Sequence, residues 1–240
     1  MTFTFGEFNF RTIDQHTCYI GTGSGDANAP IEGASYSGPA VIPSVAVDKK
    51  TGKKYTVTKI HTYSFRKCNN LSGVYIPNTI IYIGFDAFAC SSITNIVVPK
   101  SVEQLGNAAF SMLPELKSVV FEPGIKLKSL SIFVFSDCYK LKKIIIPPSV
   151  DSLSAGLIRY GKGNVDIYYC GSNIINDDFT AESSIKPTVY VTKNYPSDTF
   201  GGYEVVLLAN ESICEPYLTK IKEITCKNNK ISHIFVKFSL

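Results

Sequence analysis

Apolar residues return to equivalent positions every 22 to 25 residues between Ile60 and Leu153. Each unit contains a phenylalanine, followed by a short strand-like run of apolar residues. The equivalent phenylalanines are Phe65, Phe88, Phe110 and Phe135. A repeat of this length is typical of a solenoid, in which each unit buries its apolar face against its neighbours. The sequence therefore predicts stacked coils with the four phenylalanines aligned in one interior column.

The strand-like runs predict a sheet along one wall of the stack. Apolar residues alternate with other residues in each run, as in a strand with one buried face. We expect the last inward residues of the runs to be Ile42, Ile76, Val98, Phe121, Ile146, Ile167 and Val191. Ile20 adds an eighth coil. Strands repeated in one chain direction pair in parallel and require a crossover between them.

The domain organisation follows from the extent of this repeat. We expect leucine-rich coils over residues 40–192, capping strands and a loop over residues 1–39, and a C-terminal cap over residues 193–240. The alternating phenylalanines between Phe3 and Phe10 predict the strands that cover the first coil. A turn signal between Asp48 and Tyr55 predicts a hairpin inserted at about residues 46–58.

Small residues recur at fixed places in the coils. Gly84 and Gly106 follow the last apolar residue of a coil, where glycine permits a tight bend. Thr79, Ser101 and Ser149 share one position after the strand. We expect their hydroxyl groups to form a ladder of hydrogen bonds with neighbouring backbone turns, interrupted in the third unit by Glu122, Pro123 and Gly124.

Seven cysteines are present, and none has the spacing of a zinc site. Cys68, Cys90 and Cys138 lie close to one position of the repeat, where we expect buried free thiols. Disulfide bonds are expected mainly among Cys170, Cys214 and Cys226, with the pairing open.

Composition and motifs argue against several classes of function. A net charge of +4 without a long run of like charges gives no basis for binding nucleic acid. The glycines from Gly21 to Gly25 lack the spacing of a dinucleotide-binding loop, and no metal, phosphate or nucleophile motif is present. We expect no enzyme activity and no cofactor. His61 is expected to be a partly buried structural residue. No secretory signal is visible and no apolar run is long enough to span a membrane.

The outer face of the predicted sheet is the candidate site for a protein partner. The residue between the last two inward positions of each strand points outward, and many of these residues are apolar. An apolar stripe with a polar rim suits protein binding, although apolar residues are also favoured in strands for structural reasons. The candidate residues are Tyr75, Asn95, Val97, Lys117, Val120, Lys142, Lys143, Ile145 and Tyr190. Asp166 is expected in the same column.

The run from Leu141 to Val150, with Ile144, Ile146 and Pro147, resembles the BspA-like leucine-rich repeats. The segment from Gly84 to Cys90, with Ala87 and Phe88, is similar to the part of that repeat between strands. The resemblance covers residues 40–150 and extends in weaker form to Val191. It implies a right-handed leucine-rich-repeat array, mostly β, with a parallel sheet on one face and short helical turns or coil on the other.

Proteins of this family are surface antigens of bacteria and of parasitic protists such as trichomonads. The resemblance implies a cell-surface or secreted protein without catalytic residues. Its expected roles are adhesion to host cells or extracellular matrix proteins, and virulence. The sequons at Asn70 and Asn210 are compatible with export. The alternative is an intracellular, cytoplasmic scaffold for protein interactions, which the absence of a visible signal and the free thiols favour.

Overall fold

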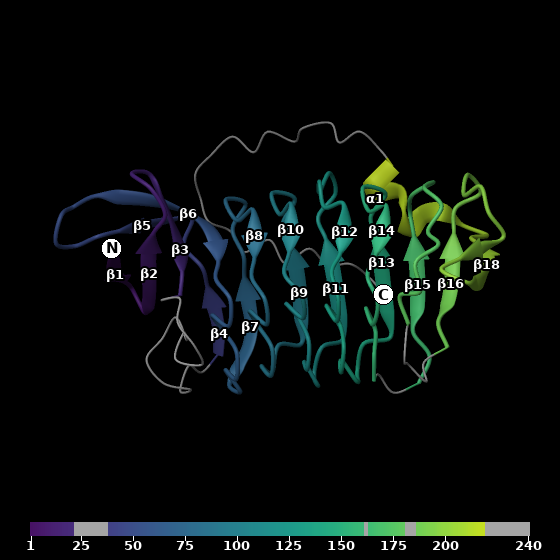
Figure 1. Ribbon diagram of the computed structural model, residues 1–240, viewed down its shortest axis with the longest axis horizontal. Helices are drawn as coiled ribbons and strands as arrows, with labels where there is room; N and C mark the ends of the chain where they lie inside the picture. The colour runs from purple at the N-terminus through teal and green to yellow at the C-terminus, as the bar shows by residue number, and fades with distance from the viewer. Residues whose placement is uncertain (22–37, 161–162, 181–185, 219–240) are drawn as a thin grey trace.

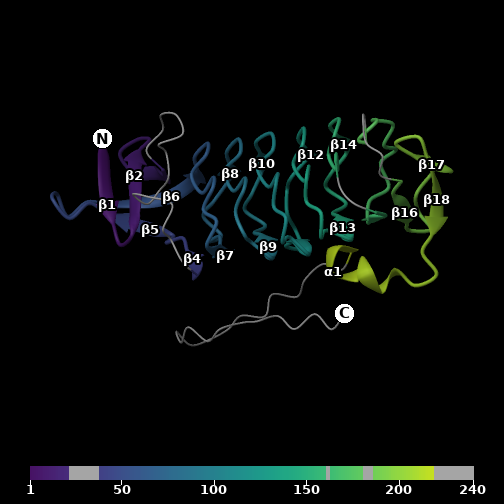
Figure 2. The same ribbon diagram turned by 90° about the horizontal axis from the view of Figure 1, so that it is seen from below.

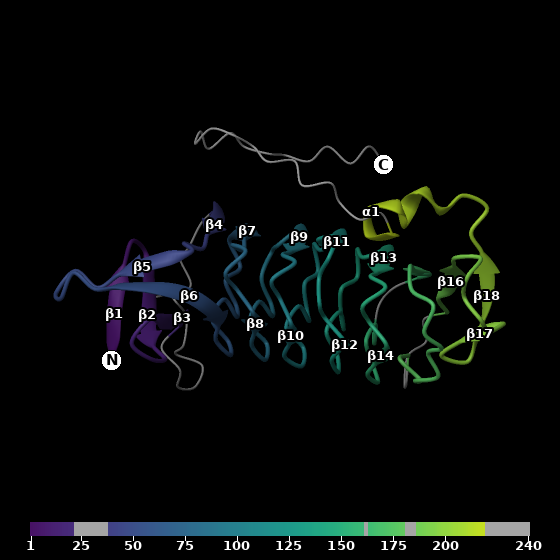
Figure 3. The ribbon, with the colours of Figure 1, turned by 90° about the horizontal axis from the view of Figure 1, so that it is seen from above.

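The computed structural model describes residues 1–21, 38–160, 163–180 and 186–218 of the 240-residue chain. Within these ranges the molecule is elongated, and its short strands run across the long axis (Figure 1). Successive coils follow one another along that axis in chain order. Two long walls face away from each other, one containing β9 and β13 and the other β8 and β10 (Figures 2 and 3).

The first wall is a parallel sheet, as the repeat predicts. Its six parallel strands are, in spatial order, β9 (Asn95–Val98), β11 (Ser118–Phe121), β13 (Lys143–Ile146), β15 (Asp166–Tyr169), β16 (Thr188–Val191) and β18 (Tyr203–Leu207). The short β17 (Thr199–Phe200) pairs antiparallel with β18. β4 (Gly38–Val41) and β7 (Leu71–Tyr75) pair in parallel and extend this row toward the N-terminus. The expected mostly-β array with a parallel sheet is therefore confirmed.

The second wall consists of shorter strands and turns. β3 (Thr17–Ile20), β6 (Lys54–Ile60), β8 (Tyr82–Ile83) and β10 (Gln104–Leu105) pair in parallel, followed by the pair β12 (Ser129–Leu130) and β14 (Ser152–Leu153). At the N-terminal end, β1 (Thr2–Phe5) and β2 (Phe8–Thr12) form an antiparallel hairpin beside β3. β5 (Val45–Val47) pairs antiparallel with β6, so a hairpin forms within the segment where the turn signal predicts one.

The column of phenylalanines lies between the two walls and is confirmed. The rings of Phe65 and Phe88 stack with centroids 5.0 Å apart and an angle of 5° between their planes. The Phe88 and Phe110 rings follow at 5.6 Å, and those of Phe110 and Phe135 at 6.1 Å. All four side chains are at most 2% exposed. Burial of each ring contributes roughly 1.5–3 kcal/mol to stability.

Left-handed backbone conformations surround each phenylalanine of the column. Residues two positions before the ring have φ between 50° and 61°, and residues two positions after it have φ between 51° and 60°. They are Tyr63, Asp86, Ala108 and Phe133 before the ring, and Lys67, Cys90, Met112 and Asp137 after it. Several of their N–H groups donate to the next coil, among them Tyr63 to Phe85 O at 3.0 Å and Lys67 to Ala89 O at 2.8 Å. Hydrogen bonds between coils thus offset a strain of about 1–2 kcal/mol per residue.

The predicted register is wrong by two residues at β15. Ile146 pairs with Tyr169, whereas Ile167 pairs with Ile144. Tyr169 then pairs with Val191 on β16. Residues two apart in a strand point to the same side, so both registers bury the same face. The pairing places Tyr168, and not Asp166, in the outward column.

The two recurring patterns of small residues have different outcomes. A Cβ atom on Gly84 would lie 2.5 Å from Thr62 N, and one on Gly106 would lie 2.5 Å from Phe85 N. The preceding coil therefore requires glycine there, because its backbone is too close for a side chain. In the expected hydroxyl ladder, only Ser101 donates to a carbonyl, that of Ile80 at 2.6 Å. The hydroxyl oxygens of Thr79 and Ser149 are buried without a hydrogen bond among the described residues, so the ladder does not form.

Candidate functional site

The structure brings all nine predicted site residues to the wall formed by the parallel sheet. Seven lie on its strands, namely Tyr75 on β7, Asn95 and Val97 on β9, Val120 on β11, Lys143 and Ile145 on β13, and Tyr190 on β16. Lys117 and Lys142 directly precede β11 and β13. Five of the nine are exposed and four are half-buried. The pleat of the strands places them on the outer face, because the alternate residues fill the core.

Strand pairing aligns the apolar members in a column across the sheet. Val97 pairs with Val120. On the neighbouring strands, Ile145 pairs with Tyr168 and Tyr168 pairs with Tyr190. The Tyr168 and Tyr190 rings stack with centroids 4.7 Å apart and an angle of 11° between their planes. The apolar side chains on these strands therefore lie beside one another in a column.

Three further apolar residues extend this column, and the sequence analysis missed them. Val41 pairs with Tyr75 at the N-terminal end, and Val206 pairs with Tyr190 at the C-terminal end. The third is Tyr168, which the two-residue shift in register brings into line. Val41 could have been found from the sequence, since it directly precedes the inward residue expected at position 42. We define the outer column as Val41, Tyr75, Val97, Val120, Ile145, Tyr168, Tyr190 and Val206.

The outer column is most exposed at its N-terminal end. Val41 is 63% exposed, Tyr75 59% and Val97 49%. Val120, Ile145, Tyr168 and Tyr190 are half-buried, and Val206 is 44% exposed. Three neighbouring strands, β4, β7 and β9, thus present large apolar side chains to solvent.

A polar row runs beside the outer column at the beginning of the strands. Asn95 and Ser118 are paired positions, and the Ser118 hydroxyl donates to Asn95 Oδ1 at 2.7 Å. Lys143 stands between Ser118 and Asp166 in the same row. Lys117 and Lys142 are exposed just before these strands. This side of the apolar surface is therefore rich in lysine.

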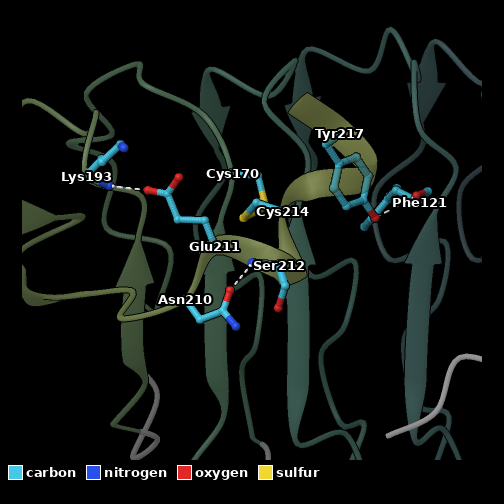
Figure 4. Close-up of a disulfide and its surroundings, with 8 residues drawn as sticks. All are labelled: Phe121, Cys170, Lys193, Asn210, Glu211, Ser212, Cys214 and Tyr217. Atoms are coloured by element: carbon cyan, nitrogen blue, oxygen red, sulfur yellow. Dashed lines mark hydrogen bonds between the residues drawn. A yellow bond between two sulfur atoms is a disulfide. The ribbon is translucent and has the colours of Figure 1, made fainter. Parts of the chain in front are cut away.

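The carboxyl ends of the strands, away from the polar row, are covered by a C-terminal strap, which we define as residues 210–217. It contains the 3₁₀ turn η2 (Glu211–Ile213) and the beginning of α1 (Glu215–Leu218). Figure 4 shows it crossing in front of the carboxyl ends of the strands. The strap leaves the lysine-rich side of the sheet uncovered.

Three contacts between the strap and the array hold it in place (Figure 4). Cys214 forms a disulfide with Cys170, which follows β15 directly. The Tyr217 hydroxyl donates to Phe121 O at 2.8 Å, and Lys193 N donates to Glu211 Oε1 at 2.8 Å. Burial raises the pKa of Tyr217 to about 12. Of the expected disulfide partners, Cys170 and Cys214 are thus joined, while Cys226 lies outside the described residues.

The free thiols differ in their surroundings. Burial raises the pKa of Cys18 and of Cys138 to about 12, and that of Cys68 to about 11. These thiols are therefore protonated near neutral pH, and a neutral thiol is a poor nucleophile. Cys90 is only half-buried, which departs from the expected full burial. His61 is half-buried and its ring stacks on that of Tyr19 with centroids 4.6 Å apart.

Within the described ranges, no cluster of three or more histidine, cysteine or acidic side chains could bind a metal ion. In those same ranges no helix has the length and apolar character needed to cross a membrane. The outer face itself offers two kinds of contact to a partner. It combines apolar contact along the outer column with hydrogen bonds and positive charge beside it.

Comparison with known proteins points to one repeat family. Residues 50–162 match the model of the BspA type leucine rich repeat region, in six copies. No curated protein sequence matches the chain. Among solved structures, the pneumococcal vaccine antigen PcpA is similar with a TM-score of 0.55 and 17% identity, over 86% of this chain and 69% of that one.

A leucine-rich cell surface protein of Faecalibacterium prausnitzii is also similar, with a TM-score of 0.53 and 21% identity. The likeness covers 81% of this chain and 55% of that protein. At such low identities, the likeness to these two structures shows the fold alone.

Proposed function

The chain belongs to the BspA-type leucine-rich-repeat family, and from this premise we propose that it is a non-enzymatic protein-binding module that acts as an adhesin at a cell surface. Its partner is a host cell-surface or extracellular matrix protein. Leucine-rich repeats form a protein-binding family, so a protein partner is the general expectation. The adhesive role and the binding face are the specific parts of the proposal.

The observation that supports this proposal best is the apolar outer column. A surface of large apolar side chains in contact with water is stabilised when a partner covers it. Val41, Tyr75 and Val97 are each about half exposed or more, and they lie on adjacent strands. At roughly 4.8 Å between strands, the eight strands span about 34 Å, a length that suits an interface of standard size.

The lysines beside the outer column favour an acidic partner. Lys117 and Lys142 are exposed beside the outer column, and Lys143 lies next to them. Charged groups at the rim of an interface accelerate association with a partner of opposite charge. We therefore expect binding to weaken as the salt concentration rises.

Two observations support a location outside the cytoplasm. The disulfide between Cys170 and Cys214 is of a kind that persists in oxidising compartments. One structural neighbour is a vaccine antigen and another a cell surface protein. Antibody staining of intact, unpermeabilised source cells tests this part of the proposal. Staining only after permeabilisation would favour the intracellular scaffold, the alternative that the free thiols Cys18, Cys68, Cys90 and Cys138 suggest.

Binding to purified matrix proteins and to intact host cells tests the outer column. One double variant carries Tyr75→Thr and Val97→Thr on the outer column. The control double variant carries Ile81→Thr and Ile132→Thr on other parts of the surface. All four residues are between 38% and 59% exposed, and threonine is favoured in strands. The first pair should weaken binding at least about tenfold, equivalent to 1.4 kcal/mol. Equal binding by both double variants, with unchanged thermal unfolding, would exclude the outer column as the binding site.

A further inference from the structure

We propose that a hollow in the second wall, over β8, β10 and β12, binds a neutral saccharide unit. The hollow has a volume of about 450 Å³ and is lined by Tyr82, Phe85, Gln104, Asn107 and Ser129, among others. The three strands that carry the hollow lie on the wall opposite β9 and β13, two strands of the outer column (Figures 2 and 3). The site is thus separate from the protein-binding face and independent of that proposal.

The repeat itself creates the hollow, because side chains at equivalent positions become smaller along the wall. Tyr82 pairs with Gln104 on the next strand, and the following strand carries Ser129 there. Beside this row, Gly106 has no side chain, since a Cβ atom would meet the backbone of Phe85 at 2.5 Å. The space is therefore built into the packing of the coils and is open to solvent.

Two aromatic side chains form one end of the hollow. Tyr82 is half-buried and Phe85 is 38% exposed. The Phe85 ring packs against Tyr63 at a steep angle of 71°, with centroids 5.3 Å apart, which restricts its position. A flat aromatic ring offers an apolar contact surface, which suits the C–H face of a sugar ring.

Four polar side chains of the hollow are available for a ligand. Among the described residues, the side chains of Tyr82, Gln104, Asn107 and Ser129 make no hydrogen bond. The hydroxyl of Ser131, which also lines the hollow, donates to Leu105 O at 2.6 Å. Each amide provides two donors and one acceptor oxygen, and each hydroxyl can do both. Groups of this kind match the hydroxyl groups of a saccharide, which also donate and accept.

The residues that line the hollow carry no formal charge, which favours a neutral ligand. Lys59 and Glu103 lie instead along a smaller neighbouring hollow of about 330 Å³. A phosphate or carboxylate ligand would find no cation in the larger hollow to offset its desolvation. A neutral sugar has no such requirement, and the volume falls within the range of about 300–1,000 Å³ for small-molecule sites.

Titration of the full chain with maltose, cellobiose, lactose and N,N′-diacetylchitobiose tests this inference. The side-chain amide signals of Gln104 and Asn107 report directly on the hollow in nitrogen-15 NMR spectra. We expect at least one of these sugars to shift both signals in a saturable way, with a Kd near 1 mM, as suits an open site. A neutral alanine peptide is titrated in parallel.

Variants separate the hollow from other surfaces. Tyr82→Ala should weaken sugar binding at least about tenfold, whereas Tyr75→Ala on the outer column should leave it unchanged. Gln104→Leu with Asn107→Leu keeps the side-chain size and should also weaken binding. The inference is wrong if no sugar gives a saturable shift, if the peptide alone does, or if these variants bind as tightly as the wild type. None of these results bears on binding at the outer column.

Discussion

Cys214 is joined by a disulfide to Cys170, 44 residues earlier in the chain and directly after β15. This bond ties the C-terminal strap to the sheet at the centre of the strap. From there the Tyr217 hydroxyl reaches Phe121 O, across a separation of 96 residues. The disulfide thus positions the hydrogen bond that links the end of the described chain to the middle of the array.

Cys214→Ser should release the strap while the coils remain folded. Closing a chain segment of this length by a disulfide stabilises a protein by about 2–4 kcal/mol. Loss of the bond should also expose the half-buried Tyr217 side chain to solvent. We expect faster cleavage by protease within residues 210–217, measured by mass spectrometry over time.

Cys90→Ser is the matched control for this experiment. It removes a thiol that forms no disulfide among the described residues. Its cleavage pattern and unfolding midpoint should be those of the wild-type protein. Equal protease resistance of Cys214→Ser and Cys90→Ser would show that the strap does not depend on the disulfide.

Phe88→Ala should be strongly destabilising because Phe88 occupies the interior of the phenylalanine column. Its ring stacks on both sides, at 5.0 Å from Phe65 and 5.6 Å from Phe110. Removing a buried phenylalanine costs about 3–5 kcal/mol of unfolding free energy. Urea denaturation measures this loss. The partly exposed Phe85 serves as comparison, and a similar loss for Phe85→Ala would contradict the importance of the column.

Gly106→Ala should destabilise the array although it adds one methyl group. The new carbon would lie 2.5 Å from Phe85 N and 2.6 Å from Gly84 C. We expect a loss of about 1–3 kcal/mol, as for other overpacked interiors. Gly73→Ala is the control, since its nearest neighbour is Pro39 Cβ at 3.9 Å. That change should be neutral or stabilising by up to about 1 kcal/mol, and equal effects in urea denaturation would refute the argument.

Alkylation of the folded protein should modify Cys90 before Cys68 and Cys138. The thiolate is the reactive form, and burial raises the pKa of Cys68 to about 11 and that of Cys138 to about 12. Mass spectrometry of the cysteine peptides after treatment with iodoacetamide measures the order. Rapid modification of Cys138 in protein that remains folded would disprove its burial.

The buried thiols of Cys18, Cys68 and Cys138 should make stability depend on pH at the alkaline end. Their pKa is higher in the folded state than the ordinary value of 9.0, so the folded protein holds more protons above that pH. Stability should therefore be fully retained below about pH 9 and fall as the pH rises toward about 12. In Cys138→Ala, the decrease over this pH window should be smaller.

The apolar pattern was sufficient to predict the coils and the phenylalanine column. A ring such as Phe88 recurs at a fixed interval, and a stack of equivalent coils is the arrangement that buries every copy in the same way. The outward direction of Tyr75 and Val97 followed from the alternation along each strand.

The apolar pattern could not predict the strand register or the local contacts. Ile167 and Tyr169 face the same way, so only the hydrogen bonds between strands could decide which one lies beside Ile146. The sequence placed Thr79 and Ser149 in the same role as Ser101, yet a hydrogen bond depends on distances of a few tenths of an ångström. Such distances are set by packing against the neighbouring coil.

The sequence by itself determined that the chain forms stacked coils with one buried and one outward side, because periodic apolar residues leave few ways to exclude water. The tertiary structure alone decided that Cys170 meets Cys214, that Tyr168 joins the outer column, and that a neutral hollow opens beside Gly106. These features join residues from different coils, and their positions depend on how closely the backbones of those coils approach one another.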